Sequence, residues 1–176
     1  MKKKIAVIGV VALVVSLGLF IYNQIIAKAF RYSTPTEAFS NSSQRDSELT
    51  DILEDQDVAL LIYKKKDGAY SDHVIAKDSR GWVPMSINYK NRRQISQDNG
   101  FIYLKEVQKK NVVQIVTIVE ANENLPAISN SMKSTFLSSS YELDSGRKLL
   151  YGFLVSEEKF PDDYKIKLGD QEIPIY

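Results

Sequence analysis

The pattern of hydrophobic and polar positions divides the chain into two unlike parts. Residues 5–22 form an uninterrupted uncharged run, whereas beyond residue 57 short apolar stretches alternate with polar turns. Extended through Ile26 as a helix, the run would reach about 33 Å, enough to cross the hydrocarbon core of a bilayer. It is apolar all round, unlike a helix that packs on a globular domain. The pattern predicts a transmembrane signal anchor at residues 5–26.

The charges that flank this run predict its orientation. Three lysines precede it at positions 2–4, and two cations, Lys28 and Arg31, follow it. The excess at the N-terminal end favours a cytoplasmic N-terminus under the positive-inside rule. We therefore expect a single-pass protein of the cell membrane whose folded part lies outside. The predicted segments are a cytoplasmic tail at 1–4, the anchor at 5–26, a connector at 27–33 and an extracytoplasmic domain at 34–176.

A cleaved secretory signal is the alternative interpretation of the same segment. Ala27-Lys28-Ala29 resembles a signal-peptidase site, so that cleavage after Ala29 would release a secreted effector or inhibitor. Secretory signals carry an apolar stretch of about 7–15 residues. The run here has 18 residues, which favours an uncleaved anchor.

Two short helices are predicted just after the connector. Thr34, Pro35 and Glu37 form a capping box with proline at the first helical position, which predicts a helix at residues 35–42. Residues 46–54 are predicted as a second turn or helix, because Leu49, Ile52 and Leu53 would share one helical face.

The rest of the chain has the pattern of β-strands. Continuous apolar runs such as residues 58–63 are typical of strands buried on both faces, and Asn99-Gly100 is typical of a hairpin turn. Pro84 and Pro174 predict edge strands. The expected strands are 58–63, 70–77, 82–87, 101–107, 112–120, a weak strand around Phe136 in a flexible stretch at 129–140, 149–155, 164–168 and 173–175.

These elements predict the fold class. The expected structure is an N-terminal transmembrane helix plus a mainly β (α+β) extracytoplasmic domain, an antiparallel sheet or sandwich with one or two short N-terminal helices. The turn after Val112–Glu120 is replaced by a longer polar break. A subdivision of the domain near residues 121–130 is a second interpretation, because each half holds a doubly apolar strand.

Composition excludes several classes of function. After Arg31 the chain carries 18 Lys and Arg against 22 Asp and Glu, a net charge of −4, which disfavours nucleic-acid binding. There is no cysteine, which excludes disulfides, thiolate nucleophiles and a lipid-modified cysteine. The lysine-rich start and the cysteine-free outer domain resemble the small exported proteins of Gram-positive bacteria in general style, without a motif that names a family.

The sequence offers little catalytic chemistry. His73 is the only histidine, and its neighbour Asp72 points to the opposite face of a strand, so a surface histidine is the simpler interpretation. The acidic residues gather at predicted turns and lack the spacing of a calcium loop. No nucleotide or other cofactor fingerprint and no metal-ligand pattern occurs, so no cofactor is expected.

The aromatic residues are the remaining candidate for a site. Five of them fall on consecutive predicted strands and would form a ligand platform if they shared an exposed face. These residues are Tyr63, Tyr70, Trp82, Tyr89 and Tyr103. Tyrosine also fits half-buried strand surfaces without a ligand.

The sequence therefore predicts a non-catalytic binding or interaction module at the cell envelope. Its expected contacts are the lipid bilayer through residues 5–26 and an envelope protein or a cell-wall polymer through the outer domain. The oligomeric state stays open. An envelope hydrolase that takes carboxylates from separate loops is the alternative, and it requires a cleft with two carboxylates about 5–10 Å apart.

Overall fold

The computed structural model describes residues 14–22, 31–84, 88–96, 100–120 and 123–175; the side chains at 84, 88–94 and 96 are outside this description. Residues 14–22 are helical and belong to the apolar run. The described helices are all shorter, or less apolar, than a segment that could cross a membrane. The rest of the predicted anchor lies outside the described residues.

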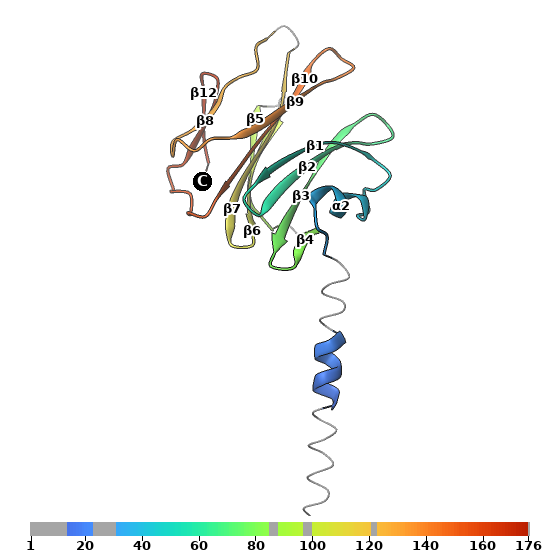
Figure 1. Cartoon of the computed structure of the whole chain (residues 1–176). Helices are drawn as coiled ribbons and strands as arrows, with labels where there is room; N and C mark the ends of the chain where they lie inside the picture. Colours follow the sequence, from blue (N-terminus) through green and yellow to red (C-terminus); the bar gives the residue numbers. More distant parts are fainter. Residues whose placement is uncertain (1–13, 23–30, 85–87, 97–99, 121–122, 176) are drawn as a thin grey trace, which may run out of the picture.

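The remainder of the described chain is mainly β and antiparallel, as predicted, with a short helix α2 (Pro35–Ser40) before the strands (Figure 1). A four-stranded sheet has the order β1 (Glu48–Asp55), β2 (Val58–Lys64), β3 (Tyr70–Asp78) and β4 (Gly81–Pro84). A five-stranded sheet has the order β5 (Asn88–Ser96), β6 (Gly100–Val107), β7 (Lys110–Val119), β10 (Lys148–Ser156) and β9 (Leu137–Glu142). A three-stranded sheet has the order β12 (Gln171–Pro174), β11 (Lys165–Leu168) and β8 (Ile128–Asn130).

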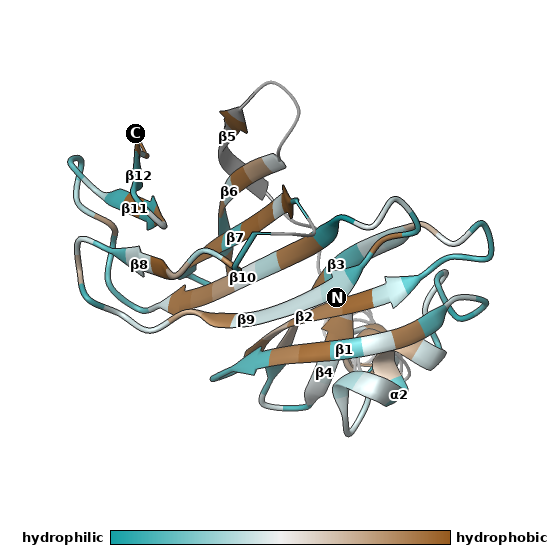
Figure 2. Ribbon diagram, turned by 90° about the horizontal axis from the view of Figure 1, so that it is seen from above, coloured by the Kyte–Doolittle hydropathy of each residue, from teal (hydrophilic) through white to brown (hydrophobic). Residues whose placement is uncertain are grey.

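These elements form four layers, with α2 and the three-stranded sheet on opposite sides of a two-sheet sandwich (Figure 2). Strand β2 shows how the layers arise, because its side chains alternate between two faces. Leu60 and Ile62 enter the core between the large sheets, whereas Leu61 and Tyr63 enter the core beneath α2. A strand that is buried on both faces needs a continuous apolar run, which is what residues 58–63 provide.

Strand β10 plays the same part in the five-stranded sheet. Tyr151 and Phe153 face the four-stranded sheet, and Leu154 packs with Tyr164 and Ile166 under the three-stranded sheet. β10 pairs with β7 from Lys148↔Val119 to Ser156↔Asn111. Strands from both sides of residues 121–130 therefore share one sheet.

Helix α2 confirms the first predicted helix and its cap. The Thr34 hydroxyl accepts a hydrogen bond from the Glu37 backbone N–H at 3.1 Å, and Pro35 begins the helix. The helix ends at Ser40, two residues earlier than predicted. Its buried side chains, Ala38 and Phe39, cover the outer face of the four-stranded sheet.

The second predicted helix, at residues 46–54, is wrong, because this segment contains strand β1. The register of β1 against β2 shifts between Leu49 and Asp51. This irregularity puts Leu49 and Ile52 on the same side, where both pack into the core beneath α2. Leu49 and Ile52 are three residues apart, which is also the spacing of neighbours on one helical face. Pairing with β2 makes the segment a strand.

Two other boundaries differ from the sequence prediction. The predicted weak strand around Phe136 is replaced by two strands, β8 and β9, and Phe136 lies before β9 and packs under the three-stranded sheet. The turn expected at Asn111 lies earlier, at Gln108 and Lys109, whose φ angles are 49° and 67°.

The edge positions expected from proline are confirmed, because β4 and β12 are the end strands of their sheets. Asn99 of the predicted hairpin and residues 85–87 of the predicted strand at 82–87 lie outside the described residues.

Candidate functional site

The first described residues of the connector, Arg31 and Tyr32, are bound to the domain. Arg31 donates from Nε to Asp78 Oδ2 at 2.9 Å, and its Nη2 lies 2.9 Å from the same oxygen. Tyr32 and Trp82 exchange two backbone hydrogen bonds, of 3.0 and 2.8 Å. The hydrogen bond from Arg31 holds the pKa of Asp78 below its usual value. We call this contact of Arg31 and Tyr32 with the β3–β4 corner the junction.

Gly81 makes this close approach feasible. Its φ angle is +132°, and a Cβ atom at this position would lie 2.6 Å from the carbonyl oxygen of Tyr32. Any larger residue would therefore combine a strained backbone with a clash against main chain. Next to it, the Trp82 side chain is only 2% exposed and packs in the core with Phe39 of α2.

The cap of α2 continues the junction along the chain. Glu37 Oε2 accepts hydrogen bonds from the Ser33 backbone N–H at 2.9 Å and from its hydroxyl at 2.6 Å. These bonds from Ser33 lower the pKa of the Glu37 carboxyl. Residues 31–40 thus hold a defined path along the four-stranded sheet instead of forming a loose tether.

On the opposite side of the molecule, the outer face of the three-stranded sheet carries a groove with a volume of about 660 Å³. Strand β11 supplies its floor, because Lys165 and Lys167 point outward while Ile166 and Leu168 enter the core. Lys167 has Ser129 of β8 and Glu172 of β12 as its cross-strand neighbours. We call this site the serine–lysine groove; the side chains that matter below are Ser129, Ser131, Lys133, Ser134, Lys165 and Lys167.

A turn organised by Asn130 forms one wall of the groove. The Asn130 side chain is 8% exposed, and its Oδ1 accepts hydrogen bonds from the N–H groups of Met132 and Ser134 at 2.9 and 3.3 Å. Its Nδ2 donates to the Ser134 carbonyl at 2.7 Å. Within this turn Lys133 has a φ angle of 58°, a left-handed conformation that favours glycine or asparagine over lysine.

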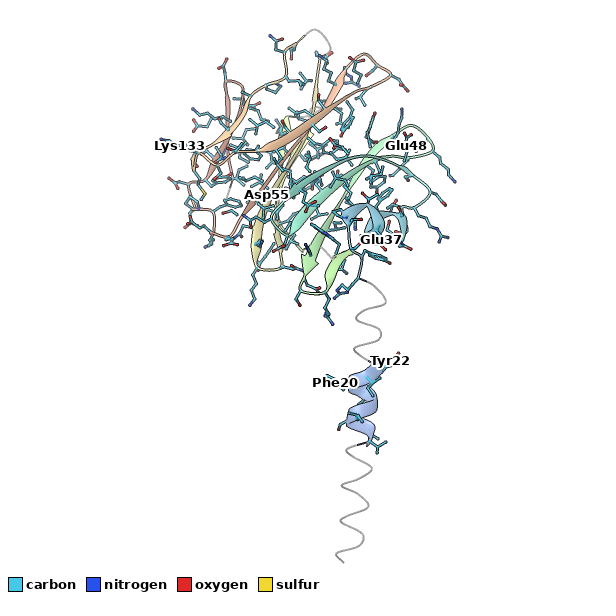
Figure 3. The ribbon with its side chains drawn as sticks, viewed as in Figure 1. Phe20, Tyr22, Glu37, Glu48, Asp55 and Lys133 are labelled. Carbon is cyan, nitrogen blue, oxygen red and sulfur yellow. The ribbon has the colours of Figure 1, made fainter. Side chains whose placement is uncertain are left out.

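The groove carries an excess of positive charge. Lys165 Nζ lies 3.2 Å from Glu172 Oε1, so the carboxylate among the described lining residues is already paired. Lys133 and Lys167 have no carboxylate partner among the residues that the structure describes. Figure 3 shows Lys133 at the margin of the domain, on the side away from Glu37 and α2.

A polar row crosses the interior between the two large sheets. Gln114 of β7 donates from Nε2 to Asp72 Oδ1 of β3 at 2.6 Å, and Lys105 of β6 donates to Gln114 Oε1. The Lys105 side chain is 2% exposed. Burial lowers the pKa of its ammonium group to about 8, against the attraction of Asp72. The row bridges the two facing sheets, and its members Lys105 and Gln114 are almost completely buried.

A second polar cluster joins the edge strands β1 and β9. Asp51 Oδ2 accepts hydrogen bonds from the Ser139 hydroxyl at 2.6 Å and from the Tyr141 hydroxyl at 3.1 Å. Burial raises the pKa of Asp51, but the hydrogen bonds outweigh it and leave this pKa below its usual value. Burial raises the pKa of Tyr141 to about 12. These hydrogen bonds join the edges of the two large sheets.

The predicted aromatic platform is not assembled on one exposed face. Tyr63 and Trp82 are buried beneath α2, Tyr70 stacks on Tyr141 with ring centroids 4.8 Å apart, and Tyr103 is half-buried on β6. The Tyr89 side chain lies outside the described residues. The described rings therefore belong to different layers of the molecule.

His73 and the acidic residues likewise form no site in the described part of the chain. His73 is half-buried, and burial lowers its pKa, whereas Asp72 bonds to Gln114 on the facing sheet. No group of three His, Asp or Glu residues close enough to hold a metal ion occurs among the described residues.

Sequence reasoning missed the groove for two reasons. The sequence predicts a weak strand in a flexible stretch at residues 129–140, and it predicts the strand at 164–168 without a neighbour. The available signal was the positive charge that alternates with Ile166 and Leu168, next to a serine-rich segment. Bringing the two together requires the pairing of β8 with β11, which the sequence does not show.

Comparison with known proteins gives no relative for this chain: no family model, no curated protein and no solved structure matches it.

Proposed function

We propose that the protein is a single-pass membrane protein that displays a non-catalytic binding domain on the outer side of the cell membrane. Residues 5–26 form the anchor, with the N-terminus in the cytoplasm, and the domain that follows contacts an envelope component. The serine–lysine groove is the binding site that we assign to this domain.

The observation that carries the proposal is the junction. Four residues, 27–30, separate the end of the predicted anchor from Arg31, which is already held by Asp78. Five Cα steps of an extended chain span at most about 17–18 Å. An anchored chain would therefore hold the β3–β4 corner close to the bilayer, which suits a domain that works at a fixed height above the membrane.

The nature of the groove favours binding over catalysis. Its described lining combines hydroxyl groups, lysines and one paired carboxylate, and it lacks the carboxylate pair that glycoside cleavage needs. The groove combines the apolar side chains of Ile128 and Phe136 with a few hydrogen-bond donors, a mixture that can orient a ligand.

The absence of cysteine makes the topology directly testable. We would introduce single cysteines at Ser79, in the β3–β4 turn, and at Asp144, in the β9–β10 turn, which lie at opposite ends of the domain (Figure 1). In intact cells a membrane-impermeant maleimide should label D144C. Labelling only after the cells are permeabilised would contradict the proposed orientation.

The same variants test the height of the domain. In nanodiscs that contain headgroup-quencher lipids, a fluorophore on S79C should be quenched strongly and one on D144C weakly. Equal quenching at the two sites would contradict a fixed junction. If the intact mass of exported protein corresponds to a chain that begins at Phe30, the N-terminal segment is a cleaved signal and not an anchor.

A further inference from the structure

We infer that the serine–lysine groove binds a linear polymer that carries phosphodiester groups. This inference rests on the proposed function and specifies the ligand class of the same site.

The volume of the groove fits a chain segment better than a single anion. At about 660 Å³ it has the size of sites that hold drug-sized molecules, and an isolated phosphate would leave most of it empty. Lys165 and Lys167, two residues apart on one face of β11, are separated by about 6.6 Å along the strand. A polymer with regularly spaced charges can contact several donors of such a surface at once.

The charge of the groove calls for an anionic ligand. Lys133 and Lys167 have no carboxylate partner among the described residues, and Glu172 is neutralised by Lys165. The two unpaired cations stand beside the hydroxyl groups of Ser129, Ser131 and Ser134. Anionic oxygens accept hydrogen bonds from such hydroxyls while the ammonium groups supply the attraction.

The cations of the groove suit phosphate. The described lining holds lysines and no arginine. Lysine binds a phosphate as a point charge, and it binds a carboxylate in the same way in the Lys165–Glu172 pair, so the comparison with oligoglutamate below decides between the two anions.

The place of the groove favours a polymer over a membrane lipid. It lies on the three-stranded sheet, in the layer opposite to α2 and the four-stranded sheet that carries the junction (Figure 2). In the anchored protein this face points away from the element nearest to the bilayer. A polymer that extends through the envelope can reach it.

The test is a binding measurement on the full-length protein in nanodiscs of neutral lipid. The probes are a fluorescent oligo(glycerol phosphate), an oligoglutamate of equal charge, and neutral dextran. The phosphodiester probe should bind at least tenfold more tightly than oligoglutamate, and dextran should not bind. Equal or tighter binding of oligoglutamate, or no binding of the phosphodiester probe, would overturn the inference.

Variants locate the site. K133S/K167S should weaken binding of the phosphodiester probe at least tenfold and reduce the slope of log K against log salt by about 1.4, if each lost phosphate contact contributes about 0.7. The matched control K65S/K66S removes the same charge from the exposed β2–β3 turn and should leave binding unchanged. Equal effects of the two double variants would show attraction to the whole surface and would overturn the groove.

Two further readouts separate this inference from the proposed function. The protein in its nanodiscs is also mixed with phosphatidylglycerol vesicles. If it sediments with the vesicles and does not bind the phosphodiester probe, the groove binds lipid and the inference of a polymer ligand is overturned. Thermal unfolding of K133S/K167S should match that of the original chain, because both side chains lie at the surface. Surface labelling of D144C without polymer binding would leave the anchored topology standing while the inference fails.

Discussion

The two sides of this molecule use their polar groups in opposite ways. At the junction, polar groups contact other groups of the same chain: Arg31 binds Asp78, the Tyr32 backbone pairs with Trp82, and Glu37 caps the start of α2. In the serine–lysine groove, Lys133 and Lys167 extend into solvent without an anionic partner in the described chain.

This difference separates stability from binding. A group whose partner belongs to the same chain stabilises the fold, by a small amount where the pair is exposed and by more where a buried side chain fills a core. A group that faces an open groove contributes little to folding and remains available to a ligand. Substitutions at the junction should therefore lower stability, and substitutions in the groove should lower binding alone.

The largest effect is expected from Trp82→Ala. Trp82 is one of the largest fully buried side chains and fills the core beneath α2. Its truncation should lower the free energy of unfolding by about 3–5 kcal/mol. Urea denaturation of the purified protein measures this loss. A loss below about 1 kcal/mol would contradict the view that the junction rests on a packed core.

A smaller effect is expected from Gly81→Ala, which tests the close contact with Tyr32. The new Cβ would meet the Tyr32 carbonyl oxygen at a backbone angle that alanine adopts poorly, so a loss of about 1–3 kcal/mol should follow. Gly146→Ala is the control for a positive φ without a contact, because Gly146 has a φ of 75° and no atom stands within 4 Å of its added Cβ. Equal losses in the two variants would show that the contact with Tyr32 contributes nothing.

These junction residues also show how far a sequence can predict this fold. The cap formed by Thr34, Pro35 and Glu37 is local, so it is legible in the sequence and is confirmed by α2. The doubly apolar runs that became β2 and β10 are likewise local signals. A helix is predicted where the structure has strand β1, because the irregular register of β1 gives Leu49 and Ile52 a helical spacing.

The candidate site depended on long-range pairing and could not be found in the same way. Lys133 and Lys167 come together because β8 pairs with β11, more than thirty residues away in sequence. The aromatic residues gave a stronger local signal, but alternation along the strands sends Tyr63 and Tyr70 to different faces of the four-stranded sheet. The pattern of residue types along a strand predicts which positions are half-buried. It does not predict which residues from different strands lie close together.

Lys105 provides an intermediate test, because it is a cation that is paired inside the molecule. Its pKa of about 8 in the folded protein lies below the ordinary value of 10.5, so the unfolded chain binds more protons between these two values. Stability from this group is therefore complete above pH 10.5 and is lost as the pH falls through 8. Between pH 7.5 and 9.5 its contribution should rise by about 2 kcal/mol.

The comparison of the original chain with Lys105→Met isolates this contribution. Urea denaturation at a series of pH values should show a rise that the variant lacks, and Gln114 can still donate to Asp72 in both proteins. The tyrosines with raised pKa values, among them Tyr141, oppose the rise above pH 10, which is why the measurement stops at 9.5. Parallel profiles of the two proteins would show that Lys105 keeps an ordinary pKa.

The smallest effect on stability, and the sharpest contrast with the junction, is expected from Lys133→Gly. Glycine removes a left-handed strain of about 1–2 kcal/mol. It also increases the entropy of the unfolded chain, at a cost of about 0.4–1 kcal/mol. The free energy of unfolding should therefore stay within about 1 kcal/mol or rise, while binding of the phosphodiester probe weakens.

Lys109→Gly is the matched control for this last comparison. Lys109 is also an exposed lysine with a left-handed backbone, at φ 67°, but it lies in the β6–β7 turn outside the groove. It should show the same small change in stability and unchanged binding. If instead Lys133→Gly loses more than about 1 kcal/mol while Lys109→Gly does not, the Lys133 side chain supports the fold of its turn, and the groove then resembles the junction in using its polar groups internally.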